Sequence, residues 1–294
     1  AHGATARTMK ATLILNPLSG KRRALSIQKM ATHMATELGA TINIQVIGSP
    51  GHGTVLAREA VAHGVDRVIC AGGDGTLNAV AAGLIGTSVP LGVVAMGSGN
   101  GYARSLGLSL RPEAALRTAF TGSAAQMDVC YVNDLPFLGT AGIGFDARVS
   151  WEFDKSTSRG LWGYMRIILK EIVTAKPMPV RITVNGTTQD AEVLMLVFAN
   201  TREFGNGAII SPGSAPDDGL AELQLVSKPW LHPLFKAFYD VYTGRADRSK
   251  YIRTVVAREA VVHQAGTIAH LDGKPVKIGH DIRFRLEAKR LWVV

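Results

Sequence analysis

The stretch "VICAGGDGTLNAV" (68–80) places three glycines and one charged residue, Asp74, between an apolar run and a helix-like run. Short apolar runs bounded by turn residues are typical of strands buried on both faces, which occur in parallel sheets covered by helices. A bend between a strand and a helix explains the glycines, but it does not explain Asp74. The stretch therefore predicts one strand, one bend and one helix of an α/β fold.

The same alternation of strand-like and helix-like segments extends over the first third of the chain. Strand-like runs lie at 12–16, 42–48, 66–71 and 90–96, and helix-like runs lie at 24–39, 53–64, 76–86 and 101–106. Strands that alternate with helices imply right-handed crossovers and a mostly parallel sheet. We expect a doubly wound α/β domain over residues 1–125.

The pattern changes after residue 125. Asn133-Asp134 and Asn185-Gly186 each separate two strand-like runs, and the second pair is a strong hairpin signal. Further strand-like runs lie at 220–226, 251–257 and 267–279, and helix-like runs lie at 161–173 and 230–243. We expect an antiparallel β-sandwich domain over residues 126–285, with 286–294 returning to complete the first domain.

Composition sets broad limits on the class of protein. Of the 294 residues 47% are hydrophobic and 19% are charged, and the formal net charge is +9. Such a chain can bury two cores, and its positive charge suits a nucleotide, nucleic acid or an acidic membrane surface. The sequence contains no recognised nucleic-acid-binding motif, so we expect no nucleic acid as partner. Cys70 and Cys130 lie in apolar runs, which favours buried thiols in a reducing compartment.

Three loops of unusual composition follow the expected strands: "NPLSGK" (16–21), "GGDGT" (72–76) and "GSGNG" (97–101). Ligands of open parallel sheets bind beyond the carboxyl ends of the strands, where glycine lets backbone N–H groups approach an oxyanion. A carboxylate among such donors is unfavourable unless a cation lies between it and a phosphate, and Mg²⁺ is commonly held by carboxylates together with substrate phosphates. Asp74 therefore indicates a metal–nucleotide site. The alternative is that Asp74 caps the following helix.

"NPLSGK", "GGDGTLN" and "MGSGNGYARSLGL" together resemble the diacylglycerol kinase catalytic superfamily, which includes bacterial lipid kinases, sphingosine kinases and ceramide kinases. The resemblance continues through "GTAGIGFDARV" (139–149), "FGNGAIISPGSAPDDGLAELQLV" (204–226) and "HLDGKPV" (270–276), and so covers nearly the whole chain. NAD kinases and phosphofructokinases share the glycine-aspartate motif. The segments "SPGSAPDDGL" and "LDGKP" are what favour the diacylglycerol kinase superfamily over these two families. The resemblance implies an α/β nucleotide domain followed by a β-sandwich, with ATP and a lipid hydroxyl meeting in the cleft between them.

The resemblance also implies roles for individual residues. Nucleotide contacts fall on Asn16, Ser19, Gly20, Ser49, Gly72, Gly73, Asp74, Gly75, Thr76, Gly97, Ser98, Gly99 and Asn100. Asp74 would also hold Mg²⁺, and Asp218 matches a position associated with a structural Mg²⁺, although Asp-Asp-Gly is favourable turn chemistry as well.

Asp272 matches the candidate general base, which would accept the proton of the substrate hydroxyl during phosphoryl transfer. Asp272 precedes a glycine, which is also a hairpin-turn signal, and Asp74 is the rival base. Asp128, Asp146 and Arg148 match positions near the substrate, where either aspartate would orient the hydroxyl or pair with the arginine.

Two positions depart from the family pattern. Bacterial diacylglycerol kinases usually carry an acidic residue where this chain has Gly101, and the family tends to have glutamate where this chain has Lys274. Both differences remove negative charge from the expected site, so the resemblance leaves the identity of the lipid open.

The helix-like runs "LWGYMRIILKEIV" (161–173) and "PWLHPLFKAFYDVY" (229–242) are rich in large apolar residues. Most of these residues would pack in a core, and an exposed subset would mark the entrance for an acyl chain. No apolar stretch reaches the roughly 18–20 residues of a membrane-spanning helix, and the first residues do not resemble a signal peptide. We expect a cytoplasmic protein in peripheral contact with anionic membrane; the sequence is compatible with a homodimer but sets no oligomeric state.

The leading interpretation is an ATP- and Mg²⁺-dependent kinase that phosphorylates a hydroxyl of a lipid such as diacylglycerol or a sphingoid base. One alternative is a soluble-substrate kinase of the NAD kinase type, which shares the glycine-aspartate motif and the two-domain plan. Another is a non-catalytic nucleotide- or lipid-binding protein, which would account for Gly101 and Lys274.

Overall fold

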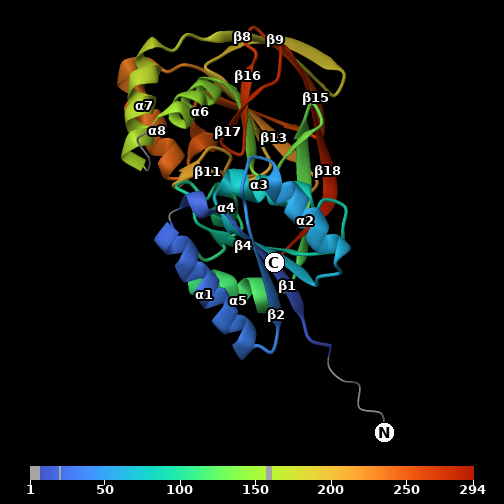
Figure 1. Cartoon of the computed structure of the whole chain (residues 1–294). Coiled ribbons are helices and arrows are strands. Elements are labelled where there is room, and N and C mark those ends of the chain that lie inside the picture. Colours follow the sequence, from blue (N-terminus) through green and yellow to red (C-terminus); the bar gives the residue numbers. More distant parts are fainter. Residues whose placement is uncertain (1–6, 20, 157–160) are drawn as a thin grey trace. The chain divides into compact units, whose positions relative to one another are not determined.

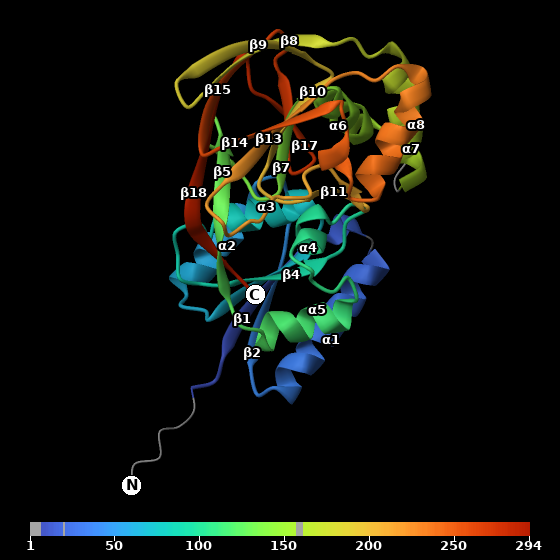
Figure 2. The same ribbon diagram turned by 180° about the vertical axis from the view of Figure 1, so that it is seen from behind.

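The computed structural model describes residues 7–19, 21–156 and 161–294, and the contacts within the chain divide it into two compact units. Unit 1 contains Ala1–Gly97, Gly107–Gln126 and Arg290–Val294, and unit 2 contains Ser98–Leu106 and Met127–Lys289. Figures 1 and 2 show the elements of each unit from opposite sides. Each unit has a hydrophobic core of its own.

Unit 1 is a parallel sheet with helices on both faces. Its strands follow the order β2-β1-β3-β4, and every pair among them is parallel. The elements are β1 (Lys10–Leu15), η1 (Pro17–Ser19), α1 (Lys21–Glu37), β2 (Thr41–Val46), α2 (His52–Ala62), β3 (Arg67–Gly72), α3 (Asp74–Ala82), β4 (Leu91–Ala95) and α5 (Pro112–Thr121).

The central strands β1, β3 and β4 of unit 1 are buried beyond their first residues because helices cover both faces of the sheet. Leu13 and Ile69 belong to the core that α1 and α5 build on one face. On the opposite face α2 contacts β1 and α3 contacts β3. The helices α2 and α3 pack closely, since a Cβ added at Gly83 would lie 2.7 Å from the Ala57 side chain. The predicted doubly wound α/β fold is confirmed.

The last strand of the chain, β18 (Asp281–Val293), has residues in each unit. Its end lies beside β4, where Val293 is in parallel register with Leu91 and the Val294 N–H donates to the Leu91 carbonyl at 2.9 Å. Its first half pairs antiparallel with β15 (Glu259–Gln264).

Within its described residues, unit 2 contains two large antiparallel sheets and the two-stranded sheet β11-β12. One large sheet has the order β14-β13-β10-β7-β16-β17, and the other contains β18-β15-β8-β9 with β5 beside β18 and β6. The strands are β5 (Ala125–Val132), β6 (Leu135–Phe137), β7 (Thr140–Gly144), β8 (Met178–Val184), β9 (Thr187–Val193), β10 (Met195–Ala199), β11 (Glu203–Gly205), β12 (Ala208–Ile209), β13 (Ala221–Val226), β14 (Ile252–Ala257), β16 (Ile268–Leu271) and β17 (Lys274–Lys277).

The two sheets of unit 2 share one core, as expected of a β-sandwich. Phe198 of β10 stacks on Phe284 of β18 with ring centroids 5.1 Å apart, which joins the two sheets at the centre. The predicted hairpin is present between β8 and β9, which pair antiparallel. Asn185 and Gly186 form its turn and both adopt positive φ, at 51° and 75°.

Three helices of unit 2 form a smaller core beside the sheets. These are α6 (Phe145–Lys155), α7 (Leu161–Thr174) and α8 (Leu231–Tyr242), and both figures show α7 and α8 side by side. Their shared core includes Val149, Ile168 and Ile172, with Leu234 and Phe238 packed against it. Unit 2 also contains the short helices α4 (Gly101–Ser105) and η2 (Ala246–Arg248). Among the described residues no helix is both long and apolar enough to cross a membrane.

Candidate active site

In unit 1 the loops after three strands converge at one edge of the sheet. Leu15 lies opposite Ala71, and Gly72 lies opposite Ala95, so β1, β3 and β4 end at the same level. The Asn16 amide donates to the Thr76 hydroxyl at 2.8 Å, which joins the first loop to the second.

The third loop begins against the second one. A Cβ added at Gly73 would lie 3.2 Å from the Gly97 Cα, so the two backbones approach closely. Gly72 is required for a similar reason, because a Cβ there would lie 2.6–2.9 Å from the Thr76 side chain. The sequence placed these loops at one sheet edge, and the structure brings them into contact.

The start of α3 gives this edge its electrostatic character. Gly73 is the N-cap residue and Asp74 lies in the first helical turn, so Asp74 is not the cap. The N–H groups of a first helical turn have no carbonyl partner inside the helix, and the helix N-terminus carries a partial positive charge. Such a terminus binds oxyanions, and the Asp74 carboxylate adds a hard oxygen ligand next to it.

The remaining nucleotide candidates of unit 1 occupy the same loops. Ser19 ends η1, and Gly20 lies outside the described residues. Ser49 follows the end of β2, and its carbonyl accepts the His52 N–H at 3.2 Å. Arg23 of α1 was not among the predicted site residues; its guanidinium reaches the Met96 carbonyl at 3.5 Å, beside the third loop. The cluster Lys21-Arg22-Arg23 was the available sequence signal.

Ser98, Gly99 and Asn100 group with unit 2. Asn100 has a φ of 54° and bridges to Gly205, and the Asn206 N–H donates to the Gly99 carbonyl at 3.0 Å. A Cβ added at Gly101 would lie 2.7 Å from the Phe204 carbonyl oxygen. The missing acidic residue at this position therefore has a steric reason, since the β11 backbone occupies the space.

Asp272 lies at the turn between β16 and β17, with a φ of 48°. Its Oδ2 accepts the Leu138 N–H at 2.8 Å, and its Oδ1 accepts the N–H groups of Gly139 and Thr140 at 2.8 and 3.2 Å. Asp272 is therefore both a turn residue and a carboxylate whose position is fixed by backbone hydrogen bonds. Lys274, the other departure from the family pattern, is exposed at the start of β17.

Asp128 and Asp272 lie in the same region of unit 2. Asp128 accepts the backbone N–H groups of Gly219 at 2.7 Å and Lys289 at 2.9 Å. Burial raises the pKa of the Tyr102 phenol, and the charges of Asp272 and Asp128 raise it further. Tyr102 is thus within electrostatic range of both carboxylates, and no sequence pattern indicated this proximity.

Asp146 and Arg148 have different partners from those expected. Buried Asp146 is hydrogen-bonded to the Nε2 of buried His270, while Arg148 binds Glu171 at 2.8 Å. The Gly273 N–H donates to the Nδ1 of His270 at 3.3 Å, so Nε2 carries the proton and donates to Asp146. Arg148 is therefore paired with neither of the two aspartates proposed for it.

Asp218 stands close to a second carboxylate. Its Oδ1 accepts the Leu220 N–H at 2.9 Å, as in the predicted turn. Buried Glu222 accepts a hydrogen bond from Ser214, and burial raises the pKa of Glu222, with the Asp218 charge adding to the effect. The described residues contain no group of three or more histidine, cysteine, aspartate or glutamate side chains that could hold a metal ion.

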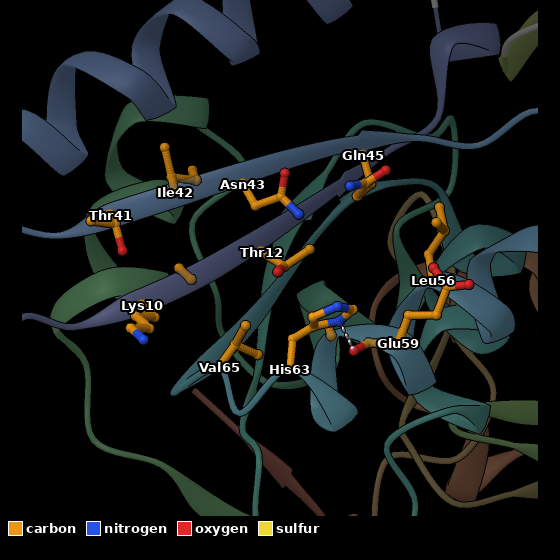
Figure 3. Close-up of a pocket in the computed structure, with 12 residues that line it drawn as sticks. Lys10, Thr12, Thr41, Ile42, Asn43, Gln45, Leu56, Glu59, His63 and Val65 are labelled. Atoms are coloured by element: carbon orange, nitrogen blue, oxygen red, sulfur yellow. Dashed lines mark hydrogen bonds between the residues drawn. The ribbon is translucent and has the colours of Figure 1, made fainter.

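A hollow of about 390 Å³ lies on unit 1 away from these loops (Figure 3). Lys10 and Thr41, the first residues of β1 and β2, line it together with Asn43 and His63. None of the predicted site residues lines this hollow, so it does not coincide with the candidate nucleotide loops.

Two family models match consecutive parts of the chain. Residues 10–132 match the diacylglycerol kinase catalytic domain. Residues 139–281 match the YegS C-terminal NAD kinase beta sandwich-like domain.

Relatives match over most of their length as well. A diacylglycerol kinase of Mycobacterium tuberculosis is 29% identical over 273 residues, which cover 90% of this chain and 88% of that protein. A Chromohalobacter salexigens protein named "probable lipid kinase YegS-like" is 32% identical over 215 residues, which cover 71% of this chain and 69% of that protein. A crystal structure of a Bacillus anthracis diacylglycerol kinase is similar in fold, with a TM-score of 0.73 at 18% identity over 98% of this chain and 97% of that chain.

The fold, the glycine loops and these relatives define the chain as a kinase. It belongs to the diacylglycerol kinase family of lipid kinases, with a second domain of the YegS type.

Proposed function

We propose that this kinase transfers the γ-phosphate of Mg²⁺-bound ATP to a hydroxyl of a membrane lipid, with diacylglycerol or a sphingoid base as the substrate class. The observation that carries the proposal is the meeting of the glycine loops at the carboxyl edge of the unit 1 sheet, joined by the 2.8 Å bond from Asn16 to Thr76. In this proposal residues 1–125 with 286–294 bind the nucleotide, and residues 126–285 bind the lipid.

The nucleotide loops would act by positioning and by charge. The first turn of α3 offers N–H donors to phosphate oxygens, and Arg23 adds a cation beside the third loop. Mg²⁺, when bound, would neutralise the charge that develops on the transferred phosphoryl group. Asp74 would hold the nucleotide-bound ion, and Asp218 with neighbouring Glu222 would suit a structural ion, because all three supply the oxygen ligands that Mg²⁺ prefers.

Asp272 is the proposed general base. Its Oδ1 already accepts two backbone N–H groups, so the proposal assigns the substrate proton to Oδ2. The backbone at Leu138–Thr140 fixes the direction of this oxygen, and phosphoryl transfer depends mainly on such positioning. Asp128, Asp146 and Arg148 remain candidates for the surroundings of the substrate, with Asp146 acting through its bond to His270.

A test compares Asp74→Asn and Asp272→Asn proteins with the parent chain in mixed micelles that contain radiolabelled ATP and a panel of lipid alcohols. We expect each variant to lose lipid phosphorylation by roughly a hundredfold or more, the usual range for a positioned acid–base group or an ion-binding carboxylate. The exposed residue Asp247 provides a matched control, and Asp247→Asn should retain parental turnover. Unchanged turnover in folded Asp74→Asn and Asp272→Asn proteins would contradict the mechanism.

The same assay separates the alternative functions. Formation of NADP from ATP and NAD, without labelled lipid, would instead identify a soluble-substrate kinase. Tight ATP binding without transfer to any lipid would identify a non-catalytic binding protein.

A further inference from the structure

The outward face of α8 is unusually apolar for an exposed helix. The side chains of Trp230, just before the helix, and Phe235 are 85% and 80% exposed, and Tyr239 and Tyr242 are exposed on the same side. Residues 235, 239 and 242 are spaced by four and three, so they share one helix face. The adjoining side of the helix already faces a core, because Leu234 and Phe238 pack against the core of the three helices. Core packing therefore does not account for the exposed aromatic residues.

The neighbouring helix α7 repeats this arrangement. Leu169 and Val173 are 55% and 67% exposed, one turn apart, while Ile168 and Ile172 fill the shared core. The two helices lie side by side in Figures 1 and 2. Their exposed apolar residues form what we call the α7–α8 face, which consists of Leu169, Val173, Trp230, Phe235, Tyr239 and Tyr242.

On the two helices the acidic residues are buried and the basic residues are exposed. Each helix has one acidic residue, and both are buried and paired: Glu171 with Arg148, and Asp240 with Lys236. The basic residues Arg166, Lys170, Lys236 and Arg245 are exposed, and the Arg245 guanidinium lies 6.0 Å from the Tyr239 ring. Beyond α8, exposed Asp247 is outnumbered by exposed Arg245, Arg248 and Lys250.

We propose that the α7–α8 face is the surface on which this kinase docks to an anionic lipid bilayer. Tryptophan and tyrosine favour the interfacial layer of a membrane, where an apolar ring and a polar edge are both solvated. An amphipathic helix with large apolar residues and flanking cations binds such a layer lying in its plane. The inference rests on the proposed lipid substrate and deepens it by naming the docking surface.

The charge pattern favours a bilayer over a second copy of the chain. In a twofold dimer each surface meets itself, so the exposed cations Arg166 and Lys170 would meet the cations of the second copy across the contact. An acidic leaflet instead offers negative charge to both. The aromatic side chains would enter the boundary between headgroups and acyl chains.

The test is flotation of the full chain with vesicles of phosphatidylcholine containing 30% phosphatidylglycerol, compared with phosphatidylcholine alone, at about 0.1 M salt. The double variant Trp230→Ser, Phe235→Ser should bind the anionic vesicles at least roughly tenfold more weakly, because it removes two large inserting side chains. The matched control is Leu25→Ser, Val261→Ser, which removes two apolar residues that are 57% and 49% exposed elsewhere on the chain. This control should bind like the parent.

A second variant tests the charges. Arg166→Gln, Lys170→Gln should weaken binding to anionic vesicles by roughly fivefold per charge removed and leave binding to neutral vesicles unchanged. Equal binding of the parent, Trp230→Ser, Phe235→Ser and control proteins to anionic vesicles would overturn the proposal. A parent dimer that the Trp230→Ser, Phe235→Ser change converts to monomers, with vesicle binding unaltered, would also overturn it and identify the face as a contact between copies.

Kinase assays separate failure of this inference from failure of the proposed function. With a short-chain diacylglycerol dissolved as monomers, the Trp230→Ser, Phe235→Ser protein should keep parental turnover, while its turnover on vesicle-borne substrate should fall in proportion to binding. If the Trp230→Ser, Phe235→Ser change abolishes vesicle binding but the parent phosphorylates no lipid, the proposed docking surface is supported and the proposed function is contradicted. If the variant keeps parental turnover on vesicle-borne substrate, only the docking surface is contradicted.

Discussion

At the scale of single residues, Asp272 and Asp128 of unit 2 are each held by backbone N–H groups. Asp272 accepts three such groups and Asp128 accepts two. Charge-assisted bonds of this kind fix both the position and the direction of the oxygens. A carboxylate held in this way keeps its charge available for a substrate or an ion, whereas one bound to arginine would be neutralised.

Glu222 leads to a prediction about pH. Burial raises the pKa of its carboxyl group in the folded protein, so ionisation of Glu222 at neutral pH lowers the free energy of unfolding. This loss of stability disappears as pH falls through the raised pKa towards about 4.3, the pKa of glutamate in the unfolded chain. Glu222→Gln should therefore raise the midpoint of urea unfolding at pH 7 in EDTA, and the gain should vanish near pH 4. The exposed Glu259→Gln serves as the control and should show no such difference. An equal or lower midpoint for Glu222→Gln at pH 7 would contradict this account.

At the scale of elements, the third glycine loop depends on its contact with β11. Asn100 bridges to Gly205, and the backbone at Phe204 leaves no room for a side chain at position 101. The sequence departure at Gly101 therefore reflects the packing of a strand against a loop, and it is not by itself evidence of a decayed site.

Gly101→Asp, which restores the acidic residue usual in bacterial relatives, should destabilise this chain by about 1–3 kcal/mol, because β11 must move to admit the side chain. Gly213→Ala is a suitable control, since a Cβ there meets nothing within 4 Å. Urea unfolding of both variants measures the difference. A Gly101→Asp protein as stable as Gly213→Ala would show that β11 shifts at little cost.

At the scale of the whole molecule, the end of the chain completes the sheet of unit 1. Leu291 and Val293 are buried, and Val293 is in register with Leu91 of β4. Residues about 200 positions apart are thus adjacent, which is a long-range pairing that local pattern does not specify.

Leu291→Ala should destabilise unit 1 by about 2–5 kcal/mol, because it leaves a cavity beside the last strand of the sheet. Amide hydrogen exchange in β4 should accelerate accordingly. Leu25→Ala, at an exposed position of α1, should change the stability by less than about 0.5 kcal/mol. Unaltered exchange in β4 of the Leu291→Ala protein would show that the chain end does not support this strand.

Much of the secondary structure could be predicted from the sequence, because it depends on residues that are close together along the chain. Apolar runs gave the strands of unit 1, and Asn185-Gly186 gave a hairpin, since these signals arise from burial and from backbone conformation. The helix α6 was not predicted. It begins after Gly144, whose φ is 84°, directly from a strand and without a side-chain cap to announce it.

The candidate site divides in the same way. Asn16 and Thr76 could be assigned to loops from sequence, but their hydrogen bond depends on two parallel strands ending at the same level. The bond between Asp146 and His270 was not predictable, because it joins side chains that are far apart in the sequence and meet only in the folded sandwich.

The sequence by itself determined the alternation of strands and helices, the glycine loops and the family, because these depend on residue type and short spacing. The tertiary structure decided which carboxylates are fixed by backbone donors, why position 101 is glycine, and which large apolar residues of α7 and α8 remain exposed. These features depend on what lies across the fold from each residue, and the helical period alone does not distinguish a face that meets a core from a face that meets solvent.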